Sequence, residues 1–368
     1  MPAVDRRLVQ NFDWKLCGLA LALALIGIGN LISAAPGAGG EIGPLPMRQL
    51  LWLGLSTLAM VLLLAIDYRV WDRLALPFLA LCVVLLVAVL AFSGVVKGSQ
   101  RWLAFGPMRL QPSELAKLAI VVVMARLVHR RRPTPTARLR ELVLPAVLVM
   151  IPVALVFRQP DLGSCLLLLL VAGSFLLLVP LPIRSLAWMG AVLGAGACGA
   201  WSFYLRGYQK ERILTFLNPE RDPLGAAYHT IQSQIAVGSG GLLGKGFLAG
   251  SQSQLEFLPE QPTDFVFSVL AEEWGFLGAG LVLLLYIVLL LRGLIVARTA
   301  KDLFGTALAL GAVSMLFWPA AVNLAMVLGL LPVVGIPLPF LSYGGSSLLV
   351  SLAAVGLLMN VSMRRYLF

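Results

Sequence analysis

Charge is scarce in this sequence, and negative charge is scarcer than positive charge. Only 12% of the 368 residues are charged, with 17 acidic residues against 28 basic ones, while 60% are hydrophobic. A soluble chain of this length would need far more charge to cover its surface. The composition therefore excludes a soluble enzyme and indicates a membrane protein. The net charge of +11 requires no nucleic acid as a partner, because anionic lipid headgroups balance basic residues that flank membrane spans.

The sequence also has few residues or motifs that bind metals or nucleotides. It contains two histidines and four cysteines, and Cys17, Cys82, Cys165 and Cys198 all lie inside apolar runs. They show no metal-ligand spacing, and we interpret them as small core residues. The segment 239–246 comes nearest to a phosphate-binding loop, but it lacks the Ser or Thr that would hold magnesium. An ATP-driven machine is therefore excluded, and no nucleotide cofactor is expected.

Long apolar runs dominate the rest of the chain. A membrane-crossing helix needs about 20 apolar residues, and the sequence predicts ten such spans. They cover 15–34, 49–66, 74–93, 113–128, 142–158, 162–180, 185–204, 265–297, 303–329 and 345–363. We therefore expect an all-α integral membrane protein, a polytopic bundle of about ten transmembrane helices in one domain over 1–368. Lys and Arg concentrate in alternate connections, so the positive-inside rule places both termini in the cytoplasm. One large structured loop, about 205–264, then lies outside between spans 7 and 8.

That loop ends in a carboxylate where the eighth span is expected to begin. Pro262 restricts the chain, Thr263 occupies the position expected of a helix N-cap, and Asp264 follows in the expected first turn. The helix dipole favours an ionised carboxylate there, whereas burial favours the protonated form. Two interpretations remain open. Either Asp264 caps the helix, or it acts as a general base while Glu260 tunes it or holds an acceptor.

The connection after the third span carries basic residues on the face where the positive-inside rule predicts few. Lys97 and Arg101 suit a phosphate group at the membrane interface, and Trp102 suits the depth of the lipid headgroups. Ordinary snorkelling of the basic side chains toward headgroups is the alternative.

The next segment combines polar residues with the start of a span. Gln111 precedes a proline, and Ser113 follows it at the expected start of a helix. Glu114 and Lys117 are three residues apart and share one face of that helix. This spacing predicts an ion pair about one turn inside the membrane. Charges inside a membrane are costly and usually mark a functional interior, although a pair that only locks the bundle is the alternative.

Further candidate residues lie in the other connections expected outside. Asp161 either caps the sixth span or faces the same cavity as Asp264. The Pro- and Gly-rich turn 331–347, which contains Ser342, is expected to pack within the protein and to wall that cavity. The long loop mixes cationic, amide, imidazole and carboxylate groups, which suits a pyrophosphate and a sugar. These loop candidates are Arg212, His229, Gln232, Lys245 and Glu256.

An amphipathic helix is expected within the long loop. Apolar residues recur at helical spacing from about 223 to 237, which predicts a helix lying along the membrane surface. The residues of its apolar face are Leu224, Tyr228, Ile231 and Ile235.

Five segments carry a resemblance to known proteins. They read KGSQRWL (97–103), QPSELAK (111–117), QPDLG (159–163), PEQPTDF (259–265) and PLPFLSYGGS (337–346). Together they are similar to the signatures of the SEDS family (shape, elongation, division and sporulation), and the match extends over nearly the whole chain. The stretches 222–233 and 252–259 resemble the elongation branch of this family, RodA, more than the division branch, FtsW.

The resemblance implies a peptidoglycan glycosyltransferase of the bacterial cytoplasmic membrane. Such proteins polymerise lipid II, a polyprenyl-pyrophosphate-linked disaccharide-pentapeptide, into glycan strands on the outer face of that membrane during cell elongation. The implied partners are a class B penicillin-binding protein, which crosslinks the strands, and other proteins of the elongation complex. The family's essential aspartate falls on Asp264, and its embedded Glu–Lys pair falls on Glu114 and Lys117. Gln261 and Pro262 stand where many relatives carry other residues, and this leaves the acidic positions intact.

The reaction so implied is an inverting transfer. Asp264 would take the proton of the acceptor hydroxyl as general base. Lys97, Arg101, Arg212 and Lys245 would hold the leaving pyrophosphate, helped by a divalent cation (Mg²⁺ or Mn²⁺) bound through phosphate. A lipid II flippase is the rival hypothesis, and it would need a polar path that reaches both faces of the membrane. The polar groups gather instead at the outer mouth, which favours the polymerase.

Overall fold

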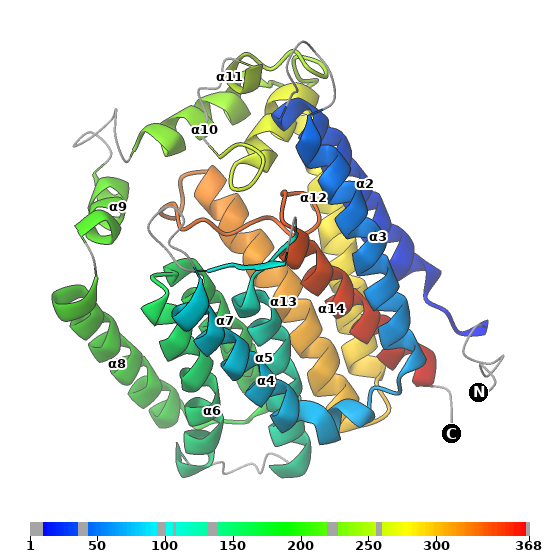
Figure 1. Cartoon of the computed structure of the whole chain (residues 1–368), viewed down its shortest axis with the longest axis vertical. Coiled ribbons are helices and arrows are strands. Elements are labelled where there is room, and N and C mark those ends of the chain that lie inside the picture. The colour runs from blue at the N-terminus through cyan, green and yellow to red at the C-terminus, as the bar shows by residue number, and fades with distance from the viewer. Residues whose placement is uncertain are drawn as a thin grey trace.

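The computed structural model describes residues 10–35, 43–93, 101–105, 108–131, 139–205, 207–218, 227–254 and 260–365. The described chain forms a helical bundle with several short helices at one end (Figure 1). The long elements are α2 (Trp14–Ala34), α3 (Pro44–Ala65), α4 (Val70–Phe92), α5 (Pro112–Arg131), α6 (Leu139–Arg158), α7 (Leu162–Ser174), α8 (Ile183–Gly199), α12 (Val266–Thr299), α13 (Leu303–Val327) and α14 (Gly345–Arg364). The short ones are β1 (Leu103–Phe105), β2 (Met108–Leu110), η2 (Phe175–Leu178), η3 (Ala200–Tyr204), α9 (Gly207–Leu217), α10 (Tyr228–Ser239) and α11 (Ser251–Gln254).

Each of the ten predicted spans corresponds to a helix. Among the described residues, eight helices are long and apolar enough to cross a membrane. The other two spans are α5, which carries charges at both ends, and α7, which η2 prolongs. The prediction of an all-helical, multi-pass membrane protein is confirmed. The antiparallel hairpin of β1 and β2 was not predicted, because three-residue strands leave no periodic signal.

The centre of the bundle is formed by α5, α13 and α14, whose residues are largely buried. Close approach between α5 and α13 depends on a glycine, since a Cβ at Gly311 would lie 2.5 Å from a methyl carbon of Val121. The outer helices α3, α4 and α6 leave many leucine and valine side chains exposed, as expected where lipid covers them. Of the elements in Figure 1, α8 stands at the edge and packs mainly against its continuation η3.

Ion pairs join the helices at one end of the bundle, which we call the terminal end. Arg69 pairs with Asp302 at 3.5 Å, and Arg130 pairs with Asp72 at 3.2 Å. The first and last long helices meet there too, because Ser362 of α14 donates to Asp13 before α2 at 3.2 Å. The opposite end, where α9, α10 and α11 lie, is called the loop end.

The helix α12 reverses direction at Gly275. Its first segment runs along α2, because Asn30 donates to the carbonyl of Val266 at 2.8 Å and Ser33, one turn further along α2, donates to Glu273. Its second segment returns, since Arg292 lies 3.5 Å from Asp13 at the start of α2. Gly275 makes the reversal possible with φ 65° and ψ −165°, a conformation open mainly to glycine. The expected single span over 265–297 is therefore two segments.

The reversal leaves backbone amides and carbonyls of α12 without partners inside the helix. The turn after α10 forms hydrogen bonds with these groups. The amides of Lys245 and Gly246 donate to the carbonyls of Glu272 and Glu273, both at 3.0 Å. In return, the amides of residues 276 and 277 donate to the carbonyls of residues 241 and 242 at 2.9 and 3.2 Å. Unpaired backbone groups are costly near a membrane, so the turn and the reversal stabilise one another.

The predicted amphipathic helix exists, but another face of it packs on the protein. Within α10, Ser233 and Ala236 are buried, whereas Ile235 is exposed. The hydroxyl groups of Ser233 and Ser268 lie 2.8 Å apart, and Ser233 also donates to the carbonyl of Val327. Small residues allow α10 to approach α12 and α13 closely, a preference that apolar periodicity does not reveal. Leu224 lies outside the described residues.

Candidate active site

Asp264 lies in a turn that precedes α12. The helix begins at Val266 with Phe265 as its N-cap residue, so the prediction that Thr263 caps it is wrong. The amides of Thr263 and Asp264 both donate to the carbonyl of Glu260, and this turn delays the start of the helix. Asp264 is therefore not the capping residue of α12, and its carboxylate is not used to cap the helix.

Two distant segments hold the backbone around Asp264. The side-chain amide of Asn323, in α13, donates to the carbonyl of Asp264 at 2.9 Å and to that of Ile336 at 2.7 Å. A Cβ placed on Gly335 would lie 3.4 Å from Oδ2 of Asp264. Tyr343 donates its amide to the carbonyl of Pro262 at 2.7 Å. The turn 331–347 thus walls the site, as predicted.

The surroundings of Asp264 raise its pKa to about 6 from the ordinary value of 3.8. Burial is the largest cause, since dense packing disfavours the charged form although the residue stays partly exposed. The negative charge of Glu260 raises the pKa further. A hydrogen bond from Thr263 and the positive charges of Arg212 and Arg101 oppose this rise. A carboxylate with a pKa near 6 can accept a proton at neutral pH.

Arg101 reaches the site from the chain just before β1. It donates to the carbonyl of Pro160 at 2.8 Å, and its Nε lies 3.5 Å from Oδ2 of Asp161. Asp161 is buried and also accepts from Gln111 at 3.3 Å and from the hydroxyl of Ser164 at 2.8 Å. Its other oxygen accepts from the Ser164 amide, so Asp161 does cap α7. Asp161 therefore pairs with Arg101, and Gln111 contacts Asp161.

Arg212 and His229 approach the site from the loop end. Arg212, in α9, donates to the carbonyl of Val333 at 3.1 Å. Burial and the charge of Arg212 lower the pKa of His229, while Glu260 opposes this shift. The same two charged residues act on Asp264, which places the four side chains in one electrostatic neighbourhood.

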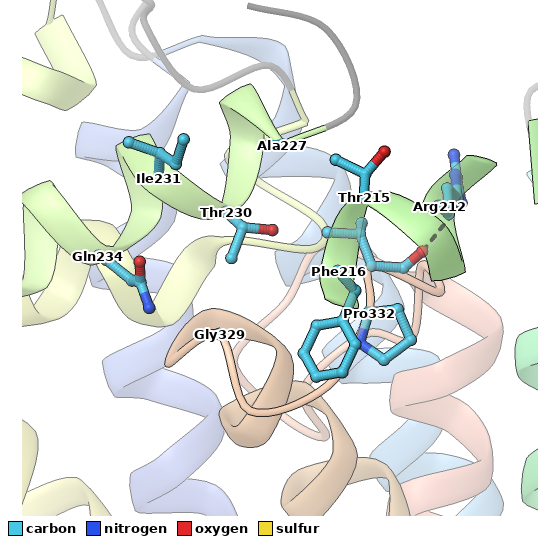
Figure 2. Close-up of a pocket in the computed structure, with 10 residues that line it drawn as sticks. Arg212, Thr215, Phe216, Ala227, Thr230, Ile231, Gln234, Gly329 and Pro332 are labelled. Carbon is cyan, nitrogen blue, oxygen red and sulfur yellow. Dashed lines mark hydrogen bonds between the residues drawn. The ribbon is translucent and has the colours of Figure 1, made fainter. Parts of the chain in front are cut away.

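A pocket adjoins Arg212 between α9, α10 and the chain that follows α13. It holds about 480 Å³, including space open to solvent. Figure 2 shows Thr230 and Gln234 of α10 facing Gly329, with Phe216 and Pro332 beside one another. A guanidinium, hydroxyl and amide groups and an aromatic ring together suit a ligand that is both polar and apolar. The lining residues are Arg212, Thr215, Phe216, Ala227, Thr230, Ile231, Gln234, Gly329, Pro332 and Val333.

The predicted ion pair inside the bundle is present. Nζ of Lys117 lies 2.8 Å from Oε2 of Glu114, and both side chains are buried. Ser113 lies in hydrogen-bond reach of Ser164, with 3.5 Å between the hydroxyl oxygens, and Ser164 contacts Asp161. The helix turn that carries the pair therefore contacts Ser164 through Ser113, and the i, i+3 spacing of Glu114 and Lys117 made their contact predictable.

Other predicted residues have structural partners. Lys245 pairs with the buried carboxylate of Glu272 at 2.7 Å and contacts Ser251 at 2.8 Å. The buried hydroxyl of Ser342 accepts from the amide of Leu338 at 2.8 Å. The backbone carbonyl of Trp102 accepts from the hydroxyl of Ser93. The side chain of Trp102 is partly exposed, and Trp102 is the neighbour of Arg101 in the sequence. Within the described part of the chain, the contacts of Lys245, Ser342 and Trp102 do not join them to the group around Asp264.

The sequence analysis missed Asn323. Asn323 was visible as a lone polar residue inside an apolar span, a pattern that often marks function. Gln232 lies partly buried on α10. Lys97 and Glu256 lie outside the described residues.

A carboxylate with a raised pKa, close enough to two arginines for their charges to act on it, lies at one end of a multi-pass helical bundle. This combination defines a membrane protein with a site suited to catalysis. Comparison with known proteins identifies the family. The FtsW/RodA/SpoVE family, described as cell cycle protein, matches residues 14–367, and the chain belongs to this family. The expected resemblance to SEDS proteins is confirmed.

Three relatives show how far the similarity extends. Peptidoglycan glycosyltransferase MrdB of Escherichia coli K12 is 43% identical over 347 residues, 94% of this chain and 93% of MrdB. A chain of a peptidoglycan synthase complex that coordinates polymerization and crosslinking has a TM-score of 0.82 at 35% identity, with 97% of this chain and 99% of that chain covered. The rod shape determining protein RodA of Thermus thermophilus has a TM-score of 0.72 at 33% identity, covering 97% and 98%. The chain is therefore close to RodA.

Proposed function

We propose that this protein is a peptidoglycan glycosyltransferase that polymerises lipid II during cell elongation. The single observation that carries the proposal is the carboxylate of Asp264, whose pKa is raised to about 6 beside Arg101 and Arg212. The names of the relatives MrdB and RodA support the same activity. The residues of this chain supply the two groups that glycosyl transfer from a pyrophosphate needs, a base and cations.

Asp264 acts as the general base. It takes the proton from the 4-hydroxyl of the acceptor sugar as that oxygen attacks C1 of the donor. The bond between C1 and the pyrophosphate oxygen breaks, and the electron pair leaves with the pyrophosphate. One displacement converts an α-linked donor into a β-1,4 linkage, so the transfer is inverting. A positioned base supplies about 10²–10⁴-fold of the rate.

Arg101 and Arg212 stabilise the negative charge that develops on the leaving group. Both donate to backbone carbonyls, which fixes each guanidinium before substrate arrives, and fixed cations act most strongly on developing charge. Among the described residues, no group of three or more His, Cys, Asp and Glu could hold a metal ion. A divalent cation, Mg²⁺ or Mn²⁺, would bind through the phosphates of the substrate, and its Lewis acidity would add to the electrostatic stabilisation that the arginines supply.

The proposed orientation places the loop end outside the cell. The terminal end carries most of the paired arginines, which agrees with the positive-inside rule, and both termini are then cytoplasmic. The proposed partner is a class B penicillin-binding protein, in line with the synthase complex to which this chain is similar. Lipid II would reach Asp264 from the outer leaflet.

The decisive test is glycan-strand formation from labelled lipid II by purified protein, alone and joined to its penicillin-binding partner. We expect polymer from the wild-type protein and a loss of at least about 10²-fold with Asp264→Asn. Glu211→Gln, a charge-neutralising change in α9, is the control and should polymerise normally. Normal polymer from Asp264→Asn would refute the general base. Absence of polymer together with lipid II movement across liposomes would favour the flippase.

A further inference from the structure

The turn between α10 and α11 exposes an unusual amount of apolar surface. We call residues 241–248 the apolar turn. Leu242 is 71% exposed and Leu243 is 79% exposed, while Phe247 and Leu248 are 50% and 48% exposed. Four large apolar side chains so close together in the chain are rarely left to water. This turn belongs neither to the pocket beside Arg212 nor to the surroundings of Asp264.

The apolar turn continues a surface that lipid must cover. Its carbonyls at residues 241 and 242 accept from the amides of Phe276 and Leu277, so it sits on the first turn of the returning segment of α12. Phe276 is 69% exposed and Leu277 is 60% exposed. The same helix exposes Leu281, Leu284 and Ile287 further along. In a multi-pass membrane protein such a row faces acyl chains, and the turn extends it without a break.

The length of α12 fixes the depth of the turn. Residues 276–299 rise about 36 Å at 1.5 Å per residue, and the hydrocarbon core is about 30 Å thick, or about 20 helical residues. Arg292 and Arg298 bracket the edge of the core at the terminal end. Counting about 20 residues back from Arg298 reaches residue 278, and the returning segment itself begins at residue 276, so the opposite edge lies at the start of this segment. The apolar turn is bonded to that stretch and therefore lies at the membrane boundary.

The one charged side chain of the turn is neutralised. Nζ of Lys245 lies 2.7 Å from the buried carboxylate of Glu272, and Ser251 contacts both partners. A free ammonium would be expensive to hold near hydrocarbon. The pairing leaves the turn with an outward surface of leucine and phenylalanine, which matches the acyl chains of lipids better than water.

We propose that the apolar turn inserts into the membrane leaflet at the loop end, so that lipid covers Leu242, Leu243, Phe247 and Leu248. The turn is thereby a membrane anchor separate from the spans. It shares four backbone hydrogen bonds and an ion pair with α12. The anchor is therefore held rigidly against the first segment of α12, which starts beside Asp264.

The test places a fluorescent label on the turn. Leu243→Cys is made in a Cys17→Ala, Cys198→Ser background, because Cys82 and Cys165 are buried. The protein is labelled with an environment-sensitive dye and incorporated into phospholipid nanodiscs. Quenching by lipids with a nitroxide near the headgroup is compared with quenching by aqueous iodide. Leu281→Cys on α12 is the lipid-facing control, and Lys301→Cys between α12 and α13 is the water-facing control.

We expect the label at residue 243 to be quenched by nitroxide lipid as at residue 281, and to be shielded from iodide several-fold relative to residue 301. Iodide quenching equal to that at residue 301 would overturn the proposal, because the turn would then lie in water. Weak quenching by both agents would overturn it too, because a protein surface would then cover the turn. Labelling at residue 242 in place of 243 repeats the measurement if the first variant is unstable.

Discussion

The two ends of the bundle use charge differently. At the terminal end, carboxylates and arginines pair across helices, as in Arg69–Asp302 and Arg130–Asp72. The loop end has ion pairs too, Arg101–Asp161 and Lys245–Glu272, but there Arg101 and Arg212 also donate to carbonyls, and the carboxylate of Asp264 has a raised pKa. The ion pairs at the terminal end stabilise helix packing. At the loop end, Arg101, Arg212 and Asp264 are held where they could bind a charged ligand. A change to Asp264, Arg101 or Arg212 at the loop end should therefore alter activity, and a change to the ion pairs of the terminal end should alter stability at most.

The largest expected effect is the dependence of turnover on pH. Because Asp264 must be ionised to accept a proton, and its pKa is about 6, kcat/KM should fall about tenfold per pH unit below 6 and level off above it. Removing Arg212 removes a charge that lowers this pKa, so Arg212→Ala should shift the falling limb to higher pH by less than about one unit. Arg130→Gln, at the terminal end, should leave the limb in place. An unchanged limb in Arg212→Ala would contradict the contrast between the two ends.

The second effect concerns the buried ion pair of Glu114 and Lys117 near the start of α5. Lys117→Ala leaves the buried carboxylate of Glu114 without its partner, and such losses cost about 3–5 kcal/mol. We expect a clear drop in thermal stability in detergent. The double change Glu114→Gln with Lys117→Met should recover most of the stability, because no uncompensated charge remains. Equal melting temperatures for Lys117→Ala and the wild type would show that water reaches the pair.

A smaller effect is expected at the start of α13. Asp302 caps this helix by accepting from the amide of Gly305 at 2.7 Å and also accepts from Tyr68 at 2.7 Å. Asp302→Ala should destabilise the fold by about 1–2 kcal/mol while activity per folded molecule stays normal. Denaturant unfolding and lipid II turnover on the same samples separate the two quantities. Loss of activity without loss of stability would break the division of roles proposed here.

The smallest effect is expected for an exposed pair at the same end. Arg130 and Asp72 lie 3.2 Å apart, and about half of the Arg130 side chain is exposed. Solvent-exposed pairs contribute about 0–1 kcal/mol, so Arg130→Gln should change stability within that range. A larger loss would mean that the terminal end depends on this pair more than its exposure suggests.

Local patterns made much of the structure predictable. Hydropathy located all ten helices, and the three-residue spacing of Glu114 and Lys117 predicted their contact, because both signals lie within one helix. Contacts over long sequence separations were not predictable. Arg101 meets Asp161 from 60 residues away, and Asn323 meets Asp264 from 59 residues away. Hydropathy does not report the direction in which a helix runs either. The sequence therefore predicts one long span over 265–297, although the chain reverses at Gly275.

The pKa of Asp264 shows the same limit. The sequence placed a carboxylate near the membrane and identified burial as one influence on it. The balance between burial, Glu260 and the two arginines required the fold, since Arg101, Arg212 and the turn 260–264 come from three separate segments. Lys245 had been expected to hold phosphate, and only the structure revealed Glu272 as its partner.

The reversal in α12 has a consequence for the order of assembly. Residues 241–246, whose backbone groups complete the reversal, precede Gly275 in the chain and leave the ribosome first. When residues 272–277 emerge, the groups that accept and donate their hydrogen bonds are already made. The outward segment can therefore fold against a finished template without waiting for chain that has yet to be synthesised.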